Sequence, residues 1–245
     1  MNRTLRRRLT VVAAASSVGV LSPVWGPILL RELPVFGVEQ LRVHGARFVP
    51  EEDIDRLAAF KPEASVWDDM RAVEAAVAGH PLITDARISR SGIHRLDIEI
   101  REVQPIVLAA TPRLVPLDAS GRSVPLEPSA HDLDLPVLLG CRVSENGRVE
   151  PEAARRSLDV LEQVSAVDSV FTRQISSLRP IGGDAVEFLL LPGSSVNRVV
   201  LPFRDPVKAF LRVERAVGTA EANGSVTSAD ARFRGEVVLR MRADG

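Results

Sequence analysis

One short segment of the chain alternates apolar and charged residues without a break. It reads Leu96-Asp97-Ile98-Glu99-Ile100-Arg101, and this period of two places Leu96, Ile98 and Ile100 on one face of a β-strand. A strand with one apolar face is stable only when another element covers that face. The segments upstream of this strand are therefore expected to fold over it.

Two short helices are predicted to supply that cover. The first begins at Pro50 with acids near the positive end of its dipole, and the second opens at Ser65-Val66-Trp67-Asp68, which has the Ser-x-x-Asp form of a capping box. Apolar residues recur at helical spacing in both. Strands are predicted at Val38–Val43 and Thr84–Ile88. The expected order from Phe36 to Ile106 is thus β-α-α-β-β.

Composition limits the classes of function. The 245 residues suit one large or two small domains, and we expect two. Lys and Arg number 31 against 32 Asp and Glu, so the chain lacks the basic excess that nucleic-acid binding usually leaves. Cys141 is the single cysteine, which excludes an intramolecular disulfide and a multi-cysteine metal site.

The N-terminus carries a membrane signal. Residues 1–8 hold four arginines, and residues 9–30 form a run of 22 residues without charge. Such a run can cross about 30 Å of hydrocarbon as a helix. The arginines before it predict that residues 1–8 are a cytoplasmic tail and that the rest of the chain lies outside the cytoplasm. The alternative is a cleaved signal peptide, because serines, glycines and prolines dilute the apolar run.

The region after Pro105 is rich in predicted strands. A hairpin is expected around Ala119-Ser120-Gly121, where the glycine can take a positive φ. One helix is predicted from Pro151 to about Asp168, and another begins at Asp205-Pro206. The further strands are expected at Ile175–Leu178, Ala185–Leu191, Val196–Leu201 and Phe233–Arg242. The second half is thus a β-rich domain with two helices.

No pattern in the sequence indicates catalysis. The four histidines, at positions 44, 80, 94 and 131, have no metal-ligand spacing, and the chain has no nucleophile elbow, Walker A loop or dinucleotide fingerprint. The acids at 51–53 and 68–69 are explained by helix N-termini, which favour negative charge. No histidine motif accompanies Cys141, so a packed or surface thiol is favoured over a nucleophile. We therefore expect that the protein is not an enzyme and that it has no cofactor, no metal site and no small-molecule substrate.

Five segments resemble the bacterial division family FtsQ/DivIB. They are Pro81–Arg90, Arg101–Pro105, Leu117–Gly121, Leu135–Gly140 and Asp230–Arg240. The resemblance extends over about residues 36–242 and implies an α+β protein with a transmembrane helix at 9–30, a POTRA domain of β-α-α-β-β order at 35–104 and an FtsQ-type β domain at 105–245.

The same resemblance directs attention to the C-terminal strand. At a sheet edge, such a strand leaves main-chain groups that a partner completes by strand addition. Arg232 could bind a partner carboxylate and Phe233 could fill an apolar pocket. Alternatively, Val237 and Leu239 are inward core residues and Arg232 is a solvated charge. The resemblance favours the interface, and the predicted partner-binding residues are Arg232, Phe233, Gly235, Val237, Val238, Leu239 and Arg240.

The leading hypothesis is a non-catalytic, single-pass scaffold of the division complex at the septum, in the cytoplasmic (inner) membrane. The resemblance implies partners similar to FtsB and FtsL, and also FtsK, FtsW and FtsI-like proteins. A second hypothesis is a POTRA-bearing transport or outer-membrane assembly component with a cleaved signal peptide. That class usually repeats the POTRA unit and continues into a membrane barrel. A third hypothesis, an envelope enzyme, would need a convergent cluster of polar residues, which no motif in the sequence indicates.

Overall fold

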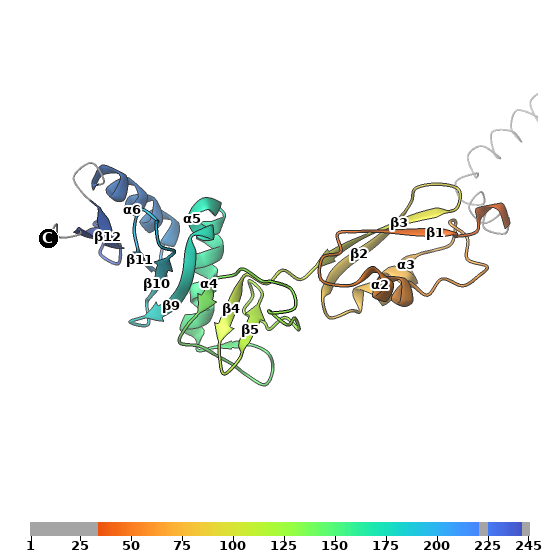
Figure 1. Ribbon diagram of the computed structural model, residues 1–245, viewed down its shortest axis with the longest axis horizontal. Coiled ribbons are helices and arrows are strands. Elements are labelled where there is room, and N and C mark those ends of the chain that lie inside the picture. The colour runs from red at the N-terminus through yellow and green to blue at the C-terminus, as the bar shows by residue number, and fades with distance from the viewer. Residues whose placement is uncertain (1–33, 221–224, 242–245) are drawn as a thin grey trace, which may run out of the picture. The chain divides into compact units, whose positions relative to one another are not determined.

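The structure is a computed structural model that describes residues 34–220 and 225–241 (Figure 1). The predicted cytoplasmic tail at 1–8 and the predicted transmembrane helix at 9–30 lie outside these residues. Within the described ranges, no helix combines the length and the apolar character that a membrane span needs. The chain divides after Glu102 into two compact units, each of which is described by itself.

The first unit has the predicted β-α-α-β-β order. Its elements are the 3₁₀ helix η1 (Pro34–Phe36), β1 (Gln40–His44), α2 (Glu51–Ala58), α3 (Arg71–Ala78), β2 (Ile83–Arg90) and β3 (Arg95–Glu102). The central strand is β3, which runs parallel to β1 and antiparallel to β2. Leu96, Ile98 and Ile100 are buried, as predicted, and both helices lie on one face of the sheet (Figure 1).

The second helix starts later than predicted. The Ser65–Asp68 segment closes a tight turn, in which the backbone N–H of Ser65 donates to the Asp68 carboxylate at 2.8 Å, and α3 begins only at Arg71. Two tertiary contacts hold this turn out of the helix. Gly37 forms a β-bridge with Ser65, and the Val66 N–H donates to the Phe36 carbonyl at 2.9 Å. The capping-box residues Ser65 and Asp68 thus stabilise a turn instead of the first turn of α3, and this turn pairs with residues 36–37, which precede β1.

Two residues fix the connection from β1 to α2 against β3. Glu102 is 8% exposed, and its carboxylate accepts hydrogen bonds from the backbone N–H of Phe48 at 2.9 Å and of Val49 at 2.9 Å. Gly45 has a φ of +86°, and a Cβ there would lie 2.3 Å from the Ile100 carbonyl oxygen. This connection therefore requires an acceptor at position 102 and a glycine at position 45.

The second unit is the β-rich region. Its elements are β4 (Val107–Ala110), β5 (Leu114–Leu117), β6 (Val137–Leu138), β7 (Arg142–Val143), β8 (Val149–Glu150), α4 (Glu152–Ser165), α5 (Ser169–Arg173), β9 (Ile175–Ile181), β10 (Ala185–Leu190), β11 (Arg198–Pro202), α6 (Pro206–Ala220), β12 (Val226–Asp230) and β13 (Val238–Met241). Eight strands form one mixed sheet in the order β13-β12-β11-β10-β9-β6-β4-β5, and β7 pairs with β8 apart from it. The mixed α+β class is as predicted.

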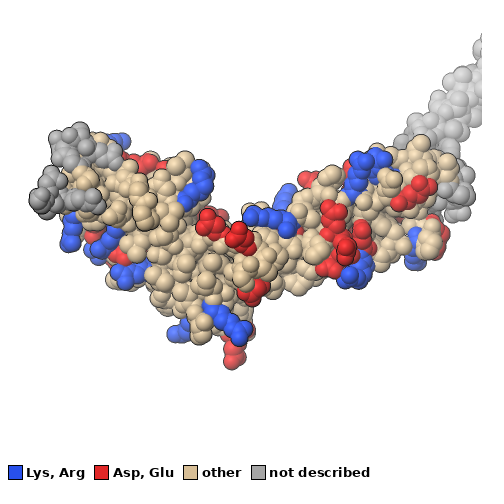
Figure 2. All heavy atoms as spheres, viewed as in Figure 1, with Lys and Arg blue, Asp and Glu red and all other residues tan. Residues whose placement is uncertain are grey.

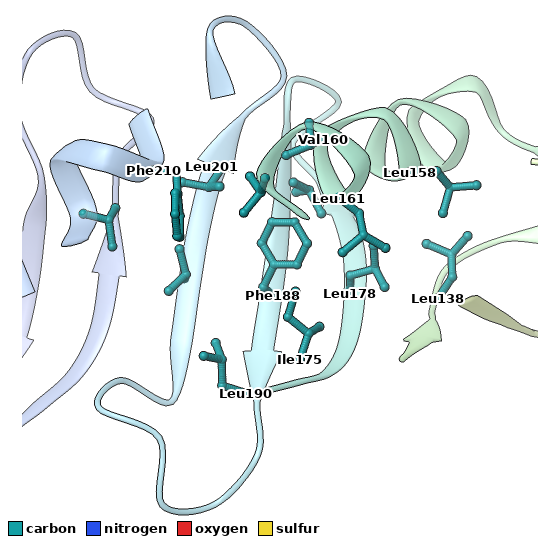
Figure 3. Close-up of a cluster of buried hydrophobic side chains, with 14 of the residues drawn as sticks. Leu138, Leu158, Val160, Leu161, Ile175, Leu178, Phe188, Leu190, Leu201 and Phe210 are labelled. Atoms are coloured by element: carbon teal, nitrogen blue, oxygen red, sulfur yellow. The ribbon is translucent and has the colours of Figure 1, made fainter. Parts of the chain in front are cut away.

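The helices α4 and α6 build the core of this unit on one face of the sheet. Phe188, Leu178 and Leu201 point from the strands toward them (Figure 3). Leu161 of α4 and Phe210 of α6 meet these side chains, and all are at most 3% exposed. Since burying one such side chain contributes about 1.5–3 kcal/mol, this layer holds the sheet against both helices.

A helix and a hairpin of the second unit differ from the sequence prediction. It contains α5 as well as α4 and α6, because Asp168 does not end a helix but caps α5, accepting from Val170 N–H at 2.7 Å and Phe171 N–H at 3.0 Å. The hairpin loop at Ala119–Gly121 is present, but its return arm forms only a bridge between Leu117 and Ser123.

Candidate functional site: the C-terminal edge of the sheet

The last strand, β13, lies at one end of the eight-stranded sheet. It pairs with β12 on one side, and among the described residues no strand or bridge pairs with its other side. The opposite end of the sheet is different. There the chain folds back along β5, with the bridge from Leu117 to Ser123 and a hydrogen bond from the Val124 N–H to the Pro116 carbonyl at 2.9 Å. Of the two ends, β13 is therefore the one that lacks such a cover along its whole described length.

The strand is shorter than predicted. It covers Val238–Met241, not Phe233–Arg242. The connection from β12 holds Arg232, Phe233, Gly235 and Val237, and Gly235 adopts a φ of +80°. A positive φ at that glycine turns the chain before β13 can begin.

The side chains of the predicted site divide between two directions. Phe233 is 51% exposed and Val238 is 47% exposed, and Arg240 is exposed as well. Val237 and Leu239 are partly buried and pack against the core under α6. The residues that face the core can offer a partner main-chain groups, whereas Phe233, Val238 and Arg240 can also offer side chains.

Arg232 already holds a carboxylate of its own chain. Its Nε donates to both oxygens of Asp230 at 3.0 and 3.1 Å, its Nη2 donates to Oδ2 at 2.7 Å, and its backbone N–H donates to Oδ1 at 3.1 Å. Sequence reasoning assigned Arg232 to a partner and gave Asp230 no role. The Asp-x-Arg spacing was the signal that could have paired them.

This ion pair shifts the pKa of both Asp230 and Arg232. Burial raises the pKa of Asp230, but the hydrogen bonds from the side chain and backbone of Arg232 outweigh it and leave the pKa below its ordinary value. The hydrogen bond to Asp230 raises the pKa of Arg232. Both groups are therefore charged at neutral pH, and the guanidinium is fixed beside the edge strand.

A row of side chains leads from the middle of the sheet to this edge. Residues directly opposite each other on neighbouring strands share a face, and the register places in one row Arg179, Glu187, Val200, Asp230 and Val238. This is the face turned away from α4 and α6, since the residues that face the helices are Val186, Phe188, Val199 and Leu201.

Glu187 is the buried ion of this row, at 2% exposure. Its Oε1 accepts from Arg179 Nε at 2.7 Å. Its Oε2 lies 2.5 Å from Arg198 Nε in an ion pair that lacks the alignment of a hydrogen bond. Sequence reasoning missed this group, because both arginines come from neighbouring strands. Removing either arginine would leave charge uncompensated at a nearly buried carboxylate.

Possible metal ligands and the single cysteine are the other groups considered in the sequence analysis. No group of three or more His, Cys, Asp or Glu side chains in the described part of the chain could hold a metal ion. The Cys141 thiol is half-buried, lies 3.3 Å from the Leu138 carbonyl, and has a pKa raised by burial. On the face seen in Figure 2, basic and acidic side chains are interspersed within each unit.

Two comparisons with known proteins bear on this site. Residues 36–102 match the family model of the FtsQ-type POTRA domain. Over 240 residues the chain is 26% identical to the cell division protein FtsQ of Myxococcus fulvus (strain ATCC BAA-855 / HW-1), in a match that covers 93% of this chain and 82% of that protein. The predicted resemblance to the FtsQ/DivIB family is thereby confirmed.

Proposed function

We propose, for a protein of the FtsQ/DivIB type, a non-catalytic role in bacterial cell division, in which the second unit binds partner proteins by strand addition at β13. The partners would be FtsB/FtsL-like division proteins. The observation that carries the proposal is that β13, at the end of an eight-stranded sheet, pairs on one side only among the described residues. Strand addition uses the main chain for affinity and side chains for selectivity.

The exposed side chains beside β13 provide the selectivity. Phe233 and Val238 are each about half exposed and offer apolar surface to a partner strand. In the free protein, Arg232 forms an ion pair with Asp230. A partner carboxylate would therefore either share this guanidinium or compete with Asp230 for it. Exposed aromatics and arginines of this kind are frequent at the centre of protein interfaces.

The proposed membrane anchor, septal location and further partners rest on the resemblance to the FtsQ/DivIB family. An N-terminal helix at residues 9–30 would anchor the chain in the cytoplasmic membrane, with both units outside the cytoplasm and gathered at the septum. The FtsQ-type POTRA unit would contribute to recruitment through FtsK, and the whole protein would link early and late division proteins such as FtsW and FtsI-like proteins. A periplasmic reporter fused after Gly245 should be active and stay with the membrane fraction, whereas soluble release would indicate a cleaved signal peptide.

The decisive experiment places the same charge on each end of the sheet. Val238 on β13 and Leu114 on β5 are both 47% exposed. Val238→Lys should lower capture of a purified FtsB/FtsL-like coiled-coil pair by about tenfold or more, because a lysine on an edge strand opposes pairing. Leu114→Lys should leave capture within about twofold of the parent, because that end already carries the bridge to Ser123.

A second variant tests the side chains. Arg232→Glu combined with Phe233→Ala should abolish capture while the circular dichroism spectrum stays that of the parent. Equal capture by both lysine variants, or full capture by the folded double variant, would reject β13 as the docking edge. A fluorescent fusion that does not gather in septal bands would reject the role in division.

A further inference from the structure

A large groove lies in the second unit at the starts of three strands. The strands β4, β6 and β9 are neighbours and run parallel, so their N-terminal ends lie side by side. Ile106, Pro136 and Ile175, at or just before these starts, lie along one side of the groove. The end of α4 and the short helix α5 form the other side, and the cavity between them has a volume of about 940 Å³.

The lining of this groove is mostly apolar. Its apolar residues include Ile106, Leu135, Pro136, Leu161, Ile175 and Leu191. Leu191 is 46% exposed although it directly follows β10, and Leu135 and Pro136 are only partly buried. A volume near the upper end of the roughly 300–1,000 Å³ found for ligand sites, combined with an apolar lining, is typical of a binding groove.

The rim of the groove is more negative than positive. Asp134, before β6, and Glu162, on α4, are exposed, and neither forms an ion pair with any described residue. The C-terminal end of α4, at Ser165, adds the negative end of a helix dipole. The positive charge on this rim comes from Arg173 on α5, whose guanidinium donates a hydrogen bond to the Ser169 hydroxyl at 3.4 Å. The balance favours a cation beside the apolar lining.

We propose that this groove binds an extended apolar segment of a partner protein that carries a lysine or arginine. The apolar side chains of that segment fill the groove, and its basic side chain lies beside Asp134 and Glu162. The groove is separate from the docking edge, because β12, β11 and β10 lie between β13 and β9 in the sheet. This second surface goes beyond the proposed function and lets one copy hold two partners at once.

The test uses the full chain and three short fluorescent peptides of identical leucine and proline content. Their central residue is lysine, norleucine or glutamate. In fluorescence anisotropy, the lysine peptide should bind most tightly and the glutamate peptide most weakly, with about a tenfold difference that shrinks as salt is added. Equal binding of the lysine and norleucine peptides, or no binding of any peptide, would overturn the proposal.

Variants locate the binding. Glu162→Lys and Asp134→Lys, made together, should invert the preference toward the glutamate peptide, and Leu191→Ser should weaken all three peptides alike. Glu145→Lys is the matched control, because Glu145 is an exposed carboxylate in the turn between β7 and β8 and is not part of the groove. Survival of the lysine preference in the double variant would contradict the assignment.

Two further measurements distinguish the groove from β13 and from a contact between copies of the chain. The Val238→Lys variant should bind the lysine peptide as the parent does, so that failure at β13 and failure at the groove are distinguishable. Sedimentation of the parent and of Leu191→Ser should give the same oligomeric state. A change in self-association with this variant would assign the groove to a second copy of the chain and reject the peptide.

Discussion

Glu102 ties the segment before α2 to the end of β3 through a carboxylate that is almost fully buried. Glu102→Ala leaves the N–H groups of Phe48 and Val49 without this acceptor, so we expect a loss of about 2–3 kcal/mol in the free energy of unfolding. Glu102→Gln keeps one acceptor oxygen and should lose less. Urea titration followed by circular dichroism measures both, with Glu99→Gln, on the exposed side of β3, as the control. Equal stability of Glu102→Ala and the control would contradict this role.

Gly45 sets a second condition on the same connection. A methyl group there would meet the Ile100 carbonyl oxygen at 2.3 Å, and the backbone has a φ of +86°. Gly45→Ala should therefore cost about 2 kcal/mol or more in the free energy of unfolding. Gly92→Ala is the matched control, because the nearest atom to its added Cβ is Arg95 Cβ at 3.6 Å. The prediction fails if thermal denaturation gives both alanine variants the same midpoint.

The pair of Asp230 and Arg232 predicts a dependence on pH. The pKa of Asp230 is lower in the folded chain than its ordinary value, so the pair stabilises the fold fully above the unfolded pKa of about 3.9 and loses this contribution as pH falls through the folded pKa. Because the pair is partly exposed, Asp230→Asn should cost about 1 kcal/mol at pH 7, and it should cost less near pH 3. Urea midpoints at the two pH values test this, and a cost that does not fall in acid would contradict it.

At the scale of elements, α5 depends on its cap. Asp168 accepts from two backbone N–H groups, and the helix places the Phe171 ring 4.7 Å from the Phe210 ring. Asp168→Ala should cost about 1 kcal/mol. Asp168→Asn keeps the cap and removes a charge that, after burial, raises the pKa of Glu214, so it should match or exceed the parent in thermal midpoint at pH 7. A loss equal to that of alanine would show that the charge, not the cap, matters.

Sequence patterns predicted the elements whose periodicity is local. The alternation at Leu96–Arg101 and the stripe of α4 needed only neighbouring residues. The start of α3 could not be predicted in the same way, because the turn at Ser65–Asp68 has the local hydrogen bonds of a capping box and is held out of the helix by Phe36 and Gly37 from a distant part of the chain.

The geometry of the candidate site could not be predicted from local sequence patterns either. That the last strand is an edge follows from the order of all eight strands, and no local pattern contains that order. The ion pairs of Glu187 with Arg179 and Arg198 likewise join three separate strands. Whether Arg232, Phe233 and the residues of β13 bind a partner stays a prediction.

At the scale of the molecule, the two units have separate cores. The chain divides after Glu102, and the buried cluster under α4 and α6 draws on the second unit alone. We therefore expect two thermal transitions in calorimetry, with Gly45→Ala lowering only one of them and Phe210→Ala lowering only the other. A single transition that both variants shift equally would mean that the units unfold together.

The unequal ends of the large sheet carry one more consequence. Among the described residues, the chain folds back along Pro116 and Leu117 of β5, whereas the outer side of β13 has no partner strand. The eight-stranded sheet should therefore gain a guest strand at β13 only. Titration should therefore saturate at one guest strand per eight-stranded sheet, and copies should not form fibres through this sheet.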